Sequence, residues 1–107
     1  MPDGYLSLSA TVVLQAVANG LGYGFDVMDA TGLPSGTVYP ALRRMEASGL
    51  VRSKWESAAT AQREQRPPRK YYDITRSGQL ALADALERYR LANRPAPRTG
   101  KPSTAKS

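Results

Sequence analysis

The sequence predicts a mainly α fold with a small β-hairpin (α+β), and three observations lead to this fold class. Apolar residues recur with the period of an amphipathic helix in three segments. Apolar and polar residues alternate, as in half-buried strands, in two short segments. The 107 residues are enough for one domain with a modest core. No apolar run approaches the roughly 18 residues needed to span a bilayer, so we expect a soluble protein.

The first helix is expected to begin at Ser7 or Ser9, either of which can cap it, and to end at Asn19-Gly20. One face of this segment is apolar at the spacing i, i+3, i+4, i+7 and i+11. These positions hold Ala10, Val13, Leu14, Val17 and Leu21. We therefore expect this helix to bury one face in the core.

Two further helices follow, joined by a tight turn. Residues 23–31 predict a short second helix with Phe25 and Met28 as its buried residues. Ser35 is then placed as the N-cap of a third helix over residues 36–47. One sector of this third helix is apolar and predicts its buried stripe, which consists of Val38, Ala41, Leu42 and Met45.

The opposite side of the third helix carries residue types that are unusual for a solvated helix face. A face that only stays hydrated would hold Glu, Lys and Gln. Pro40 removes one intrahelical hydrogen bond, although its role could be limited to shaping the start of the helix. Tyrosine and arginine can reach base edges, and a helix N-terminus favours phosphate. We therefore expect a recognition helix whose DNA-facing side holds Gly36, Thr37, Tyr39, Pro40, Arg43 and Arg44.

Two alternating segments, residues 50–56 and 69–75, predict a pair of strands. The segment between them, residues 57–68, is long for a hairpin, lacks large apolar residues and should be mobile on its own. It also carries Arg63 and Arg66. A helix-turn-helix followed by a ribbon with a basic tip predicts a winged helix-turn-helix, whose wing contacts the DNA backbone or minor groove. The side chains expected to face the core are Val51, Trp55, Tyr72 and Ile74.

A last helix is expected from Arg76 to about Asn93, with Thr75 as its cap. Its apolar stripe is broad, and leucines also occur on the far side. Singly exposed leucines are common. However, leaving several in water would forfeit about 1.5–3 kcal/mol each, so we expect a partner subunit to cover this C-terminal dimerisation helix. The expected dimer contacts are Leu80, Leu82, Leu86, Tyr89 and Leu91.

The sequence thus divides into three parts. Residues 1–75 form the predicted winged-helix DNA-binding domain, and residues 76–93 form the dimerisation helix. Residues 94–107 hold four basic residues, three prolines and no acid, which predicts a disordered basic tail.

The charge is distributed unevenly along the chain. Residues 1–42 sum to −3 and the rest of the chain to +9, which gives the net charge of +6. The basic charge of the second segment favours binding to a polyanion. We expect duplex DNA first and an anionic membrane surface second. A merely solvated surface is the alternative that charge alone leaves open.

Composition disfavours an enzyme. The chain has no Cys and no His, so it lacks thiolate and imidazole metal ligands, cysteine nucleophiles and the usual general base. It also lacks a glycine-rich phosphate loop and a carboxylate pair spaced for acid and base catalysis. We therefore expect no catalytic residues, no metal site and no cofactor.

Several of these segments together resemble the PadR family of bacterial transcriptional regulators. Within the matching segment 33–46 the most specific piece is the run from Thr37 to Glu46, and the strand from Arg69 to Thr75 is a second, independent match. The segments 23–27 and 49–51 also match, so the resemblance spans about residues 5–91. It implies a winged helix, a homodimer formed through the C-terminal helix, and repression at inverted-repeat operators. It also implies a cytoplasmic, nucleoid-associated protein.

The resemblance also implies roles for individual residues. Arg69 and Lys70 would lie near the DNA backbone at the wing. The family often has His where this chain has Tyr23, and the wing here is longer and richer in Ala, Gln and Arg. The single C-terminal helix resembles the short subclass of the family. The residues that would lie at the major groove are Ser35, Thr37, Tyr39, Pro40 and Arg43.

Two questions of partner choice follow. Some family members bind flat aromatic effectors at the dimer interface, but the last helix offers only Tyr89 as an aromatic, so an effector is unsupported. A winged-helix module that binds protein without specific DNA binding is the alternative function. It predicts an apolar patch on the third helix, where this sequence instead places Tyr39, Arg43 and Arg44.

Overall fold

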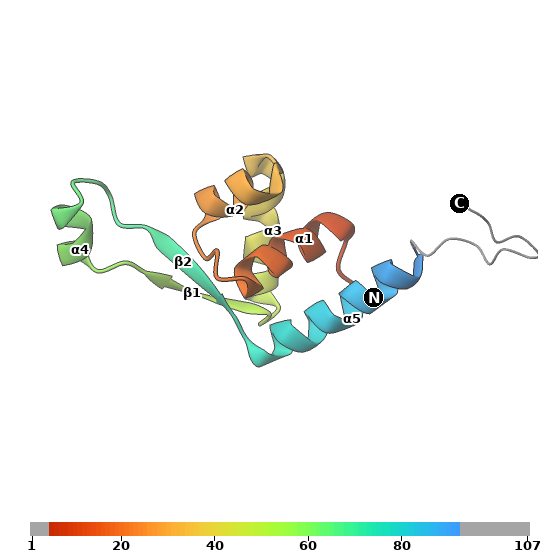
Figure 1. Cartoon of the computed structure of the whole chain (residues 1–107). Coiled ribbons are helices and arrows are strands. Elements are labelled where there is room, and N and C mark those ends of the chain that lie inside the picture. Colours follow the sequence, from red (N-terminus) through yellow and green to blue (C-terminus); the bar gives the residue numbers. More distant parts are fainter. Residues whose placement is uncertain (1–4, 93–107) are drawn as a thin grey trace, which may run out of the picture.

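A computed structural model describes residues 5–92 of the chain, with side chains as far as Arg90. The mainly α fold with one antiparallel hairpin is confirmed, and its architecture is a winged helix. In Figure 1 the hairpin projects from the helical body and carries a short helix at its far end. The elements are α1 (Leu8–Ala18), α2 (Gly24–Thr31), α3 (Ser35–Ala47), β1 (Val51–Trp55), α4 (Ala58–Arg63), β2 (Lys70–Ile74) and α5 (Arg76–Ala92). The predicted tail, residues 94–107, lies outside the described residues.

Helix α1 is the centre of the core. It packs against α2, α3, α5 and β2, and Val13 and Leu14 are fully buried. The Ser7 hydroxyl accepts a hydrogen bond from the Ala10 amide at 3.1 Å, so Ser7 is the N-cap.

None of the described helices is long and apolar enough to cross a membrane.

Helix α3 confirms its predicted buried stripe, because Val38, Ala41, Leu42 and Met45 are all buried. The prediction that Ser35 is the N-cap is wrong. Pro34 occupies that position with extended backbone angles, and its carbonyl accepts from the amides of Thr37 and Val38. No side chain caps the helix, so Ser35 is its exposed first residue.

Helix α2 corrects the prediction for Phe25, whose side chain is 63% exposed. The helix turns Gly24 and Val27 toward the core, and Phe25 lies about 100° away from Gly24 around the axis. Met28 is half-buried and packs against the core, as expected. Gly32 ends the helix in the left-handed conformation, with φ of 74°.

The hairpin pairs Val51 with Ile74 and Trp55 with Lys70. Val51 and Tyr72 are buried as predicted, but the prediction that Trp55 faces the core is wrong, because 63% of it is exposed. Alternation continues along β1, whereas the helical body underlies only its first part, as Figure 1 shows. The far end of the wing therefore has no core to cover it.

The tip of the wing is ordered by its own contacts, although its sequence predicts only a mobile loop. The Ser57 hydroxyl caps α4 by accepting from the Thr60 amide at 3.1 Å. The Glu56 carboxylate accepts two hydrogen bonds from the Arg66 guanidinium, one of them at 3.0 Å. Ala61 is buried beneath this turn. The Ser57 cap is a local contact, whereas the Glu56–Arg66 pair joins residues ten positions apart, so helical or strand periodicity does not reveal it.

The start of α5 is held against the start of β1. Thr75 caps α5 as predicted, because its hydroxyl oxygen accepts from the Gly78 amide at 3.0 Å. The same hydroxyl donates to the Gly49 carbonyl at 2.6 Å. A Cβ on Gly78 would overlap the backbone carbonyl oxygen of Leu50, so the two backbones approach closely only because residue 78 is glycine.

We expect Gly78→Ala to lower the free energy of unfolding by about 1–3 kcal/mol, because the added methyl meets backbone that must shift. Urea denaturation followed by circular dichroism measures this change. Gly36→Ala is the matched control, since a Cβ there meets open space in a helix and should stabilise by up to about 1 kcal/mol. Equal stabilities of the two variants would show that the Gly78 contact is not tight.

Candidate nucleic-acid interface

The outer side of α3 is polar, basic and open to solvent. Ser35, Arg43 and Arg44 are exposed, whereas Thr37 and Pro40 are half-buried. Among the described residues, neither arginine has an acidic side chain within ion-pair distance. A shallow hollow of about 340 Å³ lies between Pro40, both arginines and Ala47. This side of α3 therefore offers two uncompensated guanidinium groups next to a shallow surface hollow.

Pro40 lies beyond the first turn of α3, because it is the sixth residue of that helix. It has no amide to donate to the Gly36 carbonyl, so it does more than shape the helix start. A Cβ on Gly36 would meet no atom within 4 Å. The first turns of α3 thus combine an exposed backbone with small side chains, which lets a ligand approach the helix closely.

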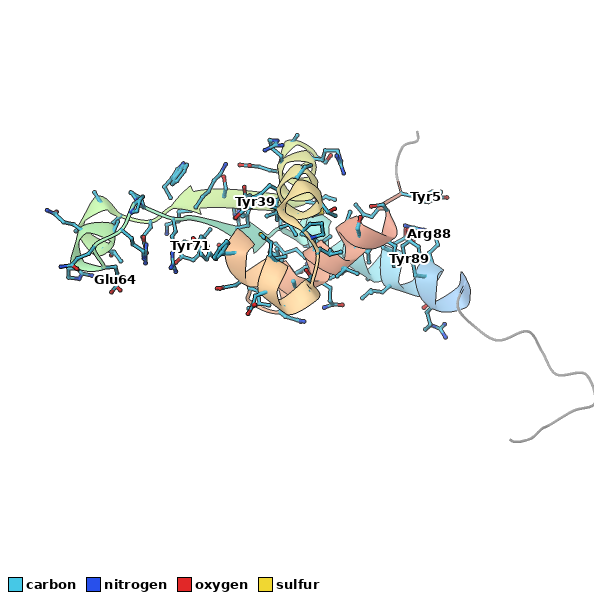
Figure 2. All side chains as sticks on the ribbon, turned by 90° about the horizontal axis from the view of Figure 1, so that it is seen from above. Tyr5, Tyr39, Glu64, Tyr71, Arg88 and Tyr89 are labelled. Carbon is cyan, nitrogen blue, oxygen red and sulfur yellow. The ribbon has the colours of Figure 1, made fainter. Side chains whose placement is uncertain are left out.

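Tyr39 is held at the junction of α2, α3 and the wing. A Cβ on Gly24 would lie 2.5 Å from a ring carbon of Tyr39, so the ring rests directly on the first residue of α2. Figure 2 shows Tyr39 on the side of α3 that faces the wing. The ring therefore lies against the first residue of α2 and remains partly exposed.

The four cations predicted for the wing have different environments. Arg63 is exposed on α4, at the tip. Arg66 is bound to Glu56, and this hydrogen-bonded pair lowers the pKa of Glu56 and raises the pKa of Arg66. The Lys70 ammonium lies 3.6 Å from Glu46, whose other oxygen accepts from the Ser53 hydroxyl.

Arg69 is the most constrained of these cations. Its guanidinium carbon lies 4.2 Å from the centre of the Tyr23 ring. A hydrogen bond with Tyr71 raises the pKa of Arg69, so the side chain remains charged. Its Nε is buried and has no acceptor among the described residues. The structure therefore leaves one donor of this cation unused just before β2.

These side chains surround a hollow of about 440 Å³ between α3 and the wing, which we call the aromatic hollow. Trp55 is on its rim, and sequence reasoning missed it because strict alternation placed the indole in the core. The only sequence signal for this hollow is the cluster of aromatic residues near the wing cations. The lining residues are Tyr23, Gly24, Tyr39, Trp55, Arg66, Pro67, Pro68, Arg69, Lys70 and Tyr72.

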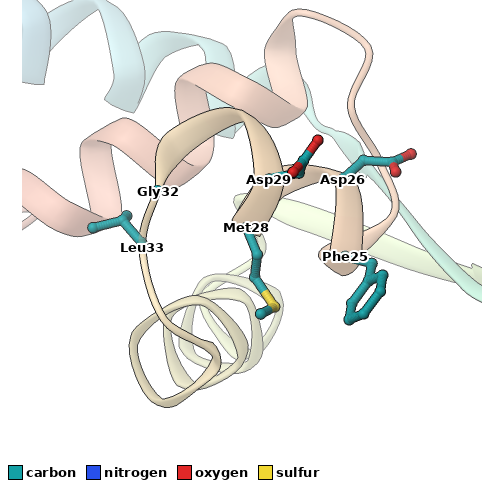
Figure 3. A pocket seen from close by; sticks show the side chains of 6 residues that line it. All are labelled: Phe25, Asp26, Met28, Asp29, Gly32 and Leu33. Atoms are coloured by element: carbon teal, nitrogen blue, oxygen red, sulfur yellow. The ribbon is translucent and has the colours of Figure 1, made fainter.

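A second hollow, of about 470 Å³, lies on α2 and has a different character (Figure 3). Asp26 and Asp29 point to one side of it, whereas the Phe25 ring points away from them. The lining holds these two acids and no cation, so it does not extend the basic surface of α3. In residues 5–92 no group of three or more acidic side chains lies close enough to hold a metal ion.

The predicted dimer contacts are divided between the core and the surface. Leu80 is 63% exposed and Leu86 is 42% exposed. Leu82 is instead buried in the protomer's own core. Tyr89 is half-buried and donates from its hydroxyl to the Leu6 carbonyl at 2.8 Å. The side chain of Leu91 lies outside the described part of the chain.

Helix α1 adds exposed apolar residues that sequence reasoning missed. Leu8 and Val12 are both exposed, on the helix that packs beside α5. Their i, i+4 spacing, outside the buried stripe, was the available signal. Apolar surface is therefore exposed on two neighbouring helices rather than on α5 alone.

Comparison with known proteins agrees with this geometry. Residues 13–84 match the model of the transcriptional regulator PadR-like family. A PadR-like transcription factor from Bacteroides fragilis superposes with a TM-score of 0.66 at 24% identity, covering 78% of this chain and 82% of that one. A PadR family regulator from Eggerthella lenta gives 0.60 at 26% identity, covering 77% and 74%.

A PadR family regulator from Clostridium difficile gives a TM-score of 0.63 at 24% identity, covering 78% of this chain and 88% of that one. A search of curated proteins finds no significant match. The family match covers most of the chain and includes α3 and the wing. The chain therefore belongs to the PadR-like family of transcriptional regulators, and it is a winged-helix, DNA-binding regulator rather than an enzyme.

Proposed function

We propose that this regulator is a repressor that binds an inverted-repeat operator sequence-specifically as a homodimer. The observation that carries the proposal is the outer side of α3, where Arg43 and Arg44 are exposed without acidic partners among the described residues. Arginine is the side chain that reads guanine edges most often, through two parallel hydrogen bonds. A protein-docking module would need an apolar surface at this place.

In the proposed complex, α3 lies in the major groove and the wing lies on the neighbouring backbone. The small residues and exposed backbone of the first turns of α3 support a close approach to the bases. The α3 residues proposed to face DNA are Ser35, Thr37, Tyr39, Pro40, Arg43 and Arg44. The wing residues proposed to face the backbone are Arg63, Arg66, Arg69 and Lys70.

The proposed dimer is formed by α5 together with α1. Exposed Leu80 and Leu86 on α5 and exposed Leu8 and Val12 on α1 would lose their contact with water there. A two-fold axis would place the two α3 helices about 34 Å apart, one turn of DNA, or a multiple of it. In this proposal residues 1–75 form the DNA-binding domain, residues 76–93 form the dimerisation helix and residues 94–107 form a basic tail. A regulator of this kind acts on the chromosome, in the cytoplasm.

Arg43→Ala should weaken binding to the cognate site by about 1–3 kcal/mol and weaken binding to random duplex much less, because a base contact is lost. The cognate site is first obtained by sequencing genomic fragments that the protein retains. Fluorescence anisotropy at several salt concentrations then gives both affinities.

Arg90→Ala is the matched control, because it also removes one positive charge but lies on α5, paired with Glu87. It should leave the preference for the cognate site unchanged. An equal loss of affinity on cognate and random DNA for Arg43→Ala would reassign Arg43 to a phosphate. Absence of duplex binding at low salt would overturn the DNA-binding function.

The double variant Leu80→Glu with Leu86→Glu should give a folded monomer that no longer binds the operator cooperatively, because two charges would be buried at the interface. Sedimentation velocity at micromolar concentration measures the state of association. Phe25→Glu is the control, since Phe25 is as exposed as Leu80 but lies on α2. An unmodified protein that sediments as a monomer would contradict the proposed dimer.

A further inference from the structure

Trp55 is a large apolar side chain that the fold leaves in water. It is the only tryptophan of the chain and the last residue of β1. Its partner across the hairpin is Lys70, whose ammonium lies 5.8 Å from the centre of the indole ring. Neither the core nor the apolar surface of α1 and α5 includes Trp55. Trp55 is exposed because β1 extends beyond the helical body, so the indole is available to contact a ligand.

The aromatic hollow provides the context of Trp55. Its walls combine rings from three separate parts of the chain, Tyr23 before α2, Tyr39 on α3, and Trp55 with Tyr72 on the hairpin. Two consecutive prolines complete the apolar part of the lining. The charged lining residues are all cations, and no carboxylate lines the hollow. It therefore suits a unit that has an apolar face next to an anionic group.

The cations of the hollow are not equivalent toward such a unit. Glu56 already binds Arg66, and Glu46 lies near Lys70. Arg69 has no acid within ion-pair distance among the described residues, and its buried Nε has no acceptor. An anion entering the hollow would supply a partner charge that Arg69 lacks.

The position of the hollow points to a nucleic-acid strand. Tyr39 belongs both to α3 and to the hollow, and Figure 2 shows it between the helix and the wing. If α3 occupies the major groove and the wing follows the adjoining backbone, one strand must cross from α3 to the wing. The hollow lies on that path. A deoxyribose has an apolar face and is linked directly to a phosphate, which matches the chemistry of the lining.

We propose that the aromatic hollow binds one sugar–phosphate unit of a DNA strand, with Trp55 packed on the sugar and with Arg69 and Lys70 facing the phosphate. This inference rests on the proposed DNA complex and adds to it a subsite at the end of β1. The contact of Trp55 is apolar, so its share of the affinity does not depend on salt. The wing thus contacts the duplex through an apolar side chain as well as through its charges.

The single tryptophan makes the subsite directly observable. Titration of the dimeric full chain with operator duplex should change the emission of Trp55 saturably, with the same midpoint as fluorescence anisotropy of labelled DNA. Duplex binding without a change in Trp55 emission would overturn the subsite and leave the DNA-binding function intact. Absence of duplex binding would instead overturn the function on which the subsite rests.

Two further titrations distinguish the source of the sugar–phosphate unit. Deoxyadenosine monophosphate and inorganic phosphate should leave the Trp55 emission unchanged at micromolar concentration, because a single unit lacks the contacts of the neighbouring strand and of α3. A saturable response to micromolar deoxyadenosine monophosphate would assign the hollow to a free nucleotide and overturn the assignment to a DNA strand.

Substitutions test the apolar nature of the contact. Trp55→Ala should weaken binding of operator and random duplex alike by about tenfold, because a large apolar side chain no longer loses its contact with water on binding. The slope of affinity against salt should stay unchanged, whereas Lys70→Gln should reduce it by about one unit. Trp55→Phe should retain most of the affinity, because a ring remains.

Phe25→Ala is the matched control, because Phe25 is as exposed as Trp55 but does not line the hollow. It should leave DNA affinity unchanged. Circular dichroism verifies that each variant is folded. We expect both to fold, because Trp55 and Phe25 are exposed. Affinity of Trp55→Ala equal to that of Phe25→Ala would overturn the proposal, and so would a difference between Trp55→Ala and the unmodified protein that disappears at low salt.

Discussion

The place of the wing relative to α3 depends on one close backbone contact, between Gly22 and Tyr72. The Tyr72 amide donates to the Gly22 carbonyl at 2.9 Å, and an isolated bridge pairs Tyr23 with Tyr71. A Cβ on Gly22 would lie 2.5 Å from the Tyr72 carbonyl oxygen, so no larger residue allows this approach. The segment before α2 thereby acts as a short third strand. It sets the distance between the hairpin and α3, and with it the width of the aromatic hollow.

Some charged residues of the wing stabilise its tip and others are available to DNA. The net charge of the chain does not distinguish these two roles. Arg66 and Glu56 hold the turn around α4 together, whereas Arg63 faces solvent. The hydrogen bond with Arg66 lowers the pKa of Glu56 below the value that Glu56 has in the unfolded chain. The Glu56 carboxylate therefore stabilises the folded protein at pH values above that unfolded-state pKa. This stabilisation is lost as the pH falls through the lowered pKa of Glu56 in the folded protein. The tip therefore keeps its shape through an ion pair, and only part of its positive charge is free to meet DNA.

Exposed apolar side chains differ in chemistry between the α1 and α5 surface and the wing. On α1 and α5 they are aliphatic, as Leu8, Leu80 and Leu86 show, and they suit burial against an equally apolar surface. At the end of β1 they are aromatic and lie near cations, as Trp55 beside Lys70 shows. In the proposed DNA complex, the aliphatic side chains would contact the partner protomer and Trp55 would contact the DNA strand.

The sequence by itself determined the order of the elements other than α4, the hairpin and the buried stripe of α3, because helical and strand periods are local properties. It also determined the basic and aromatic character of the α3 surface. Only the tertiary structure decided that Trp55 is exposed, that Leu82 is buried and that Arg66 binds Glu56. The alternation of apolar and polar residues does not reveal at which residue of a strand the underlying helices end. An apolar stripe on a helix does not reveal whether the protomer's own core or a partner subunit covers it. Contacts between residues that are distant in the sequence depend on how the helices and strands pack together. In this chain that packing includes close approaches that only the glycines at positions 22, 24 and 78 allow.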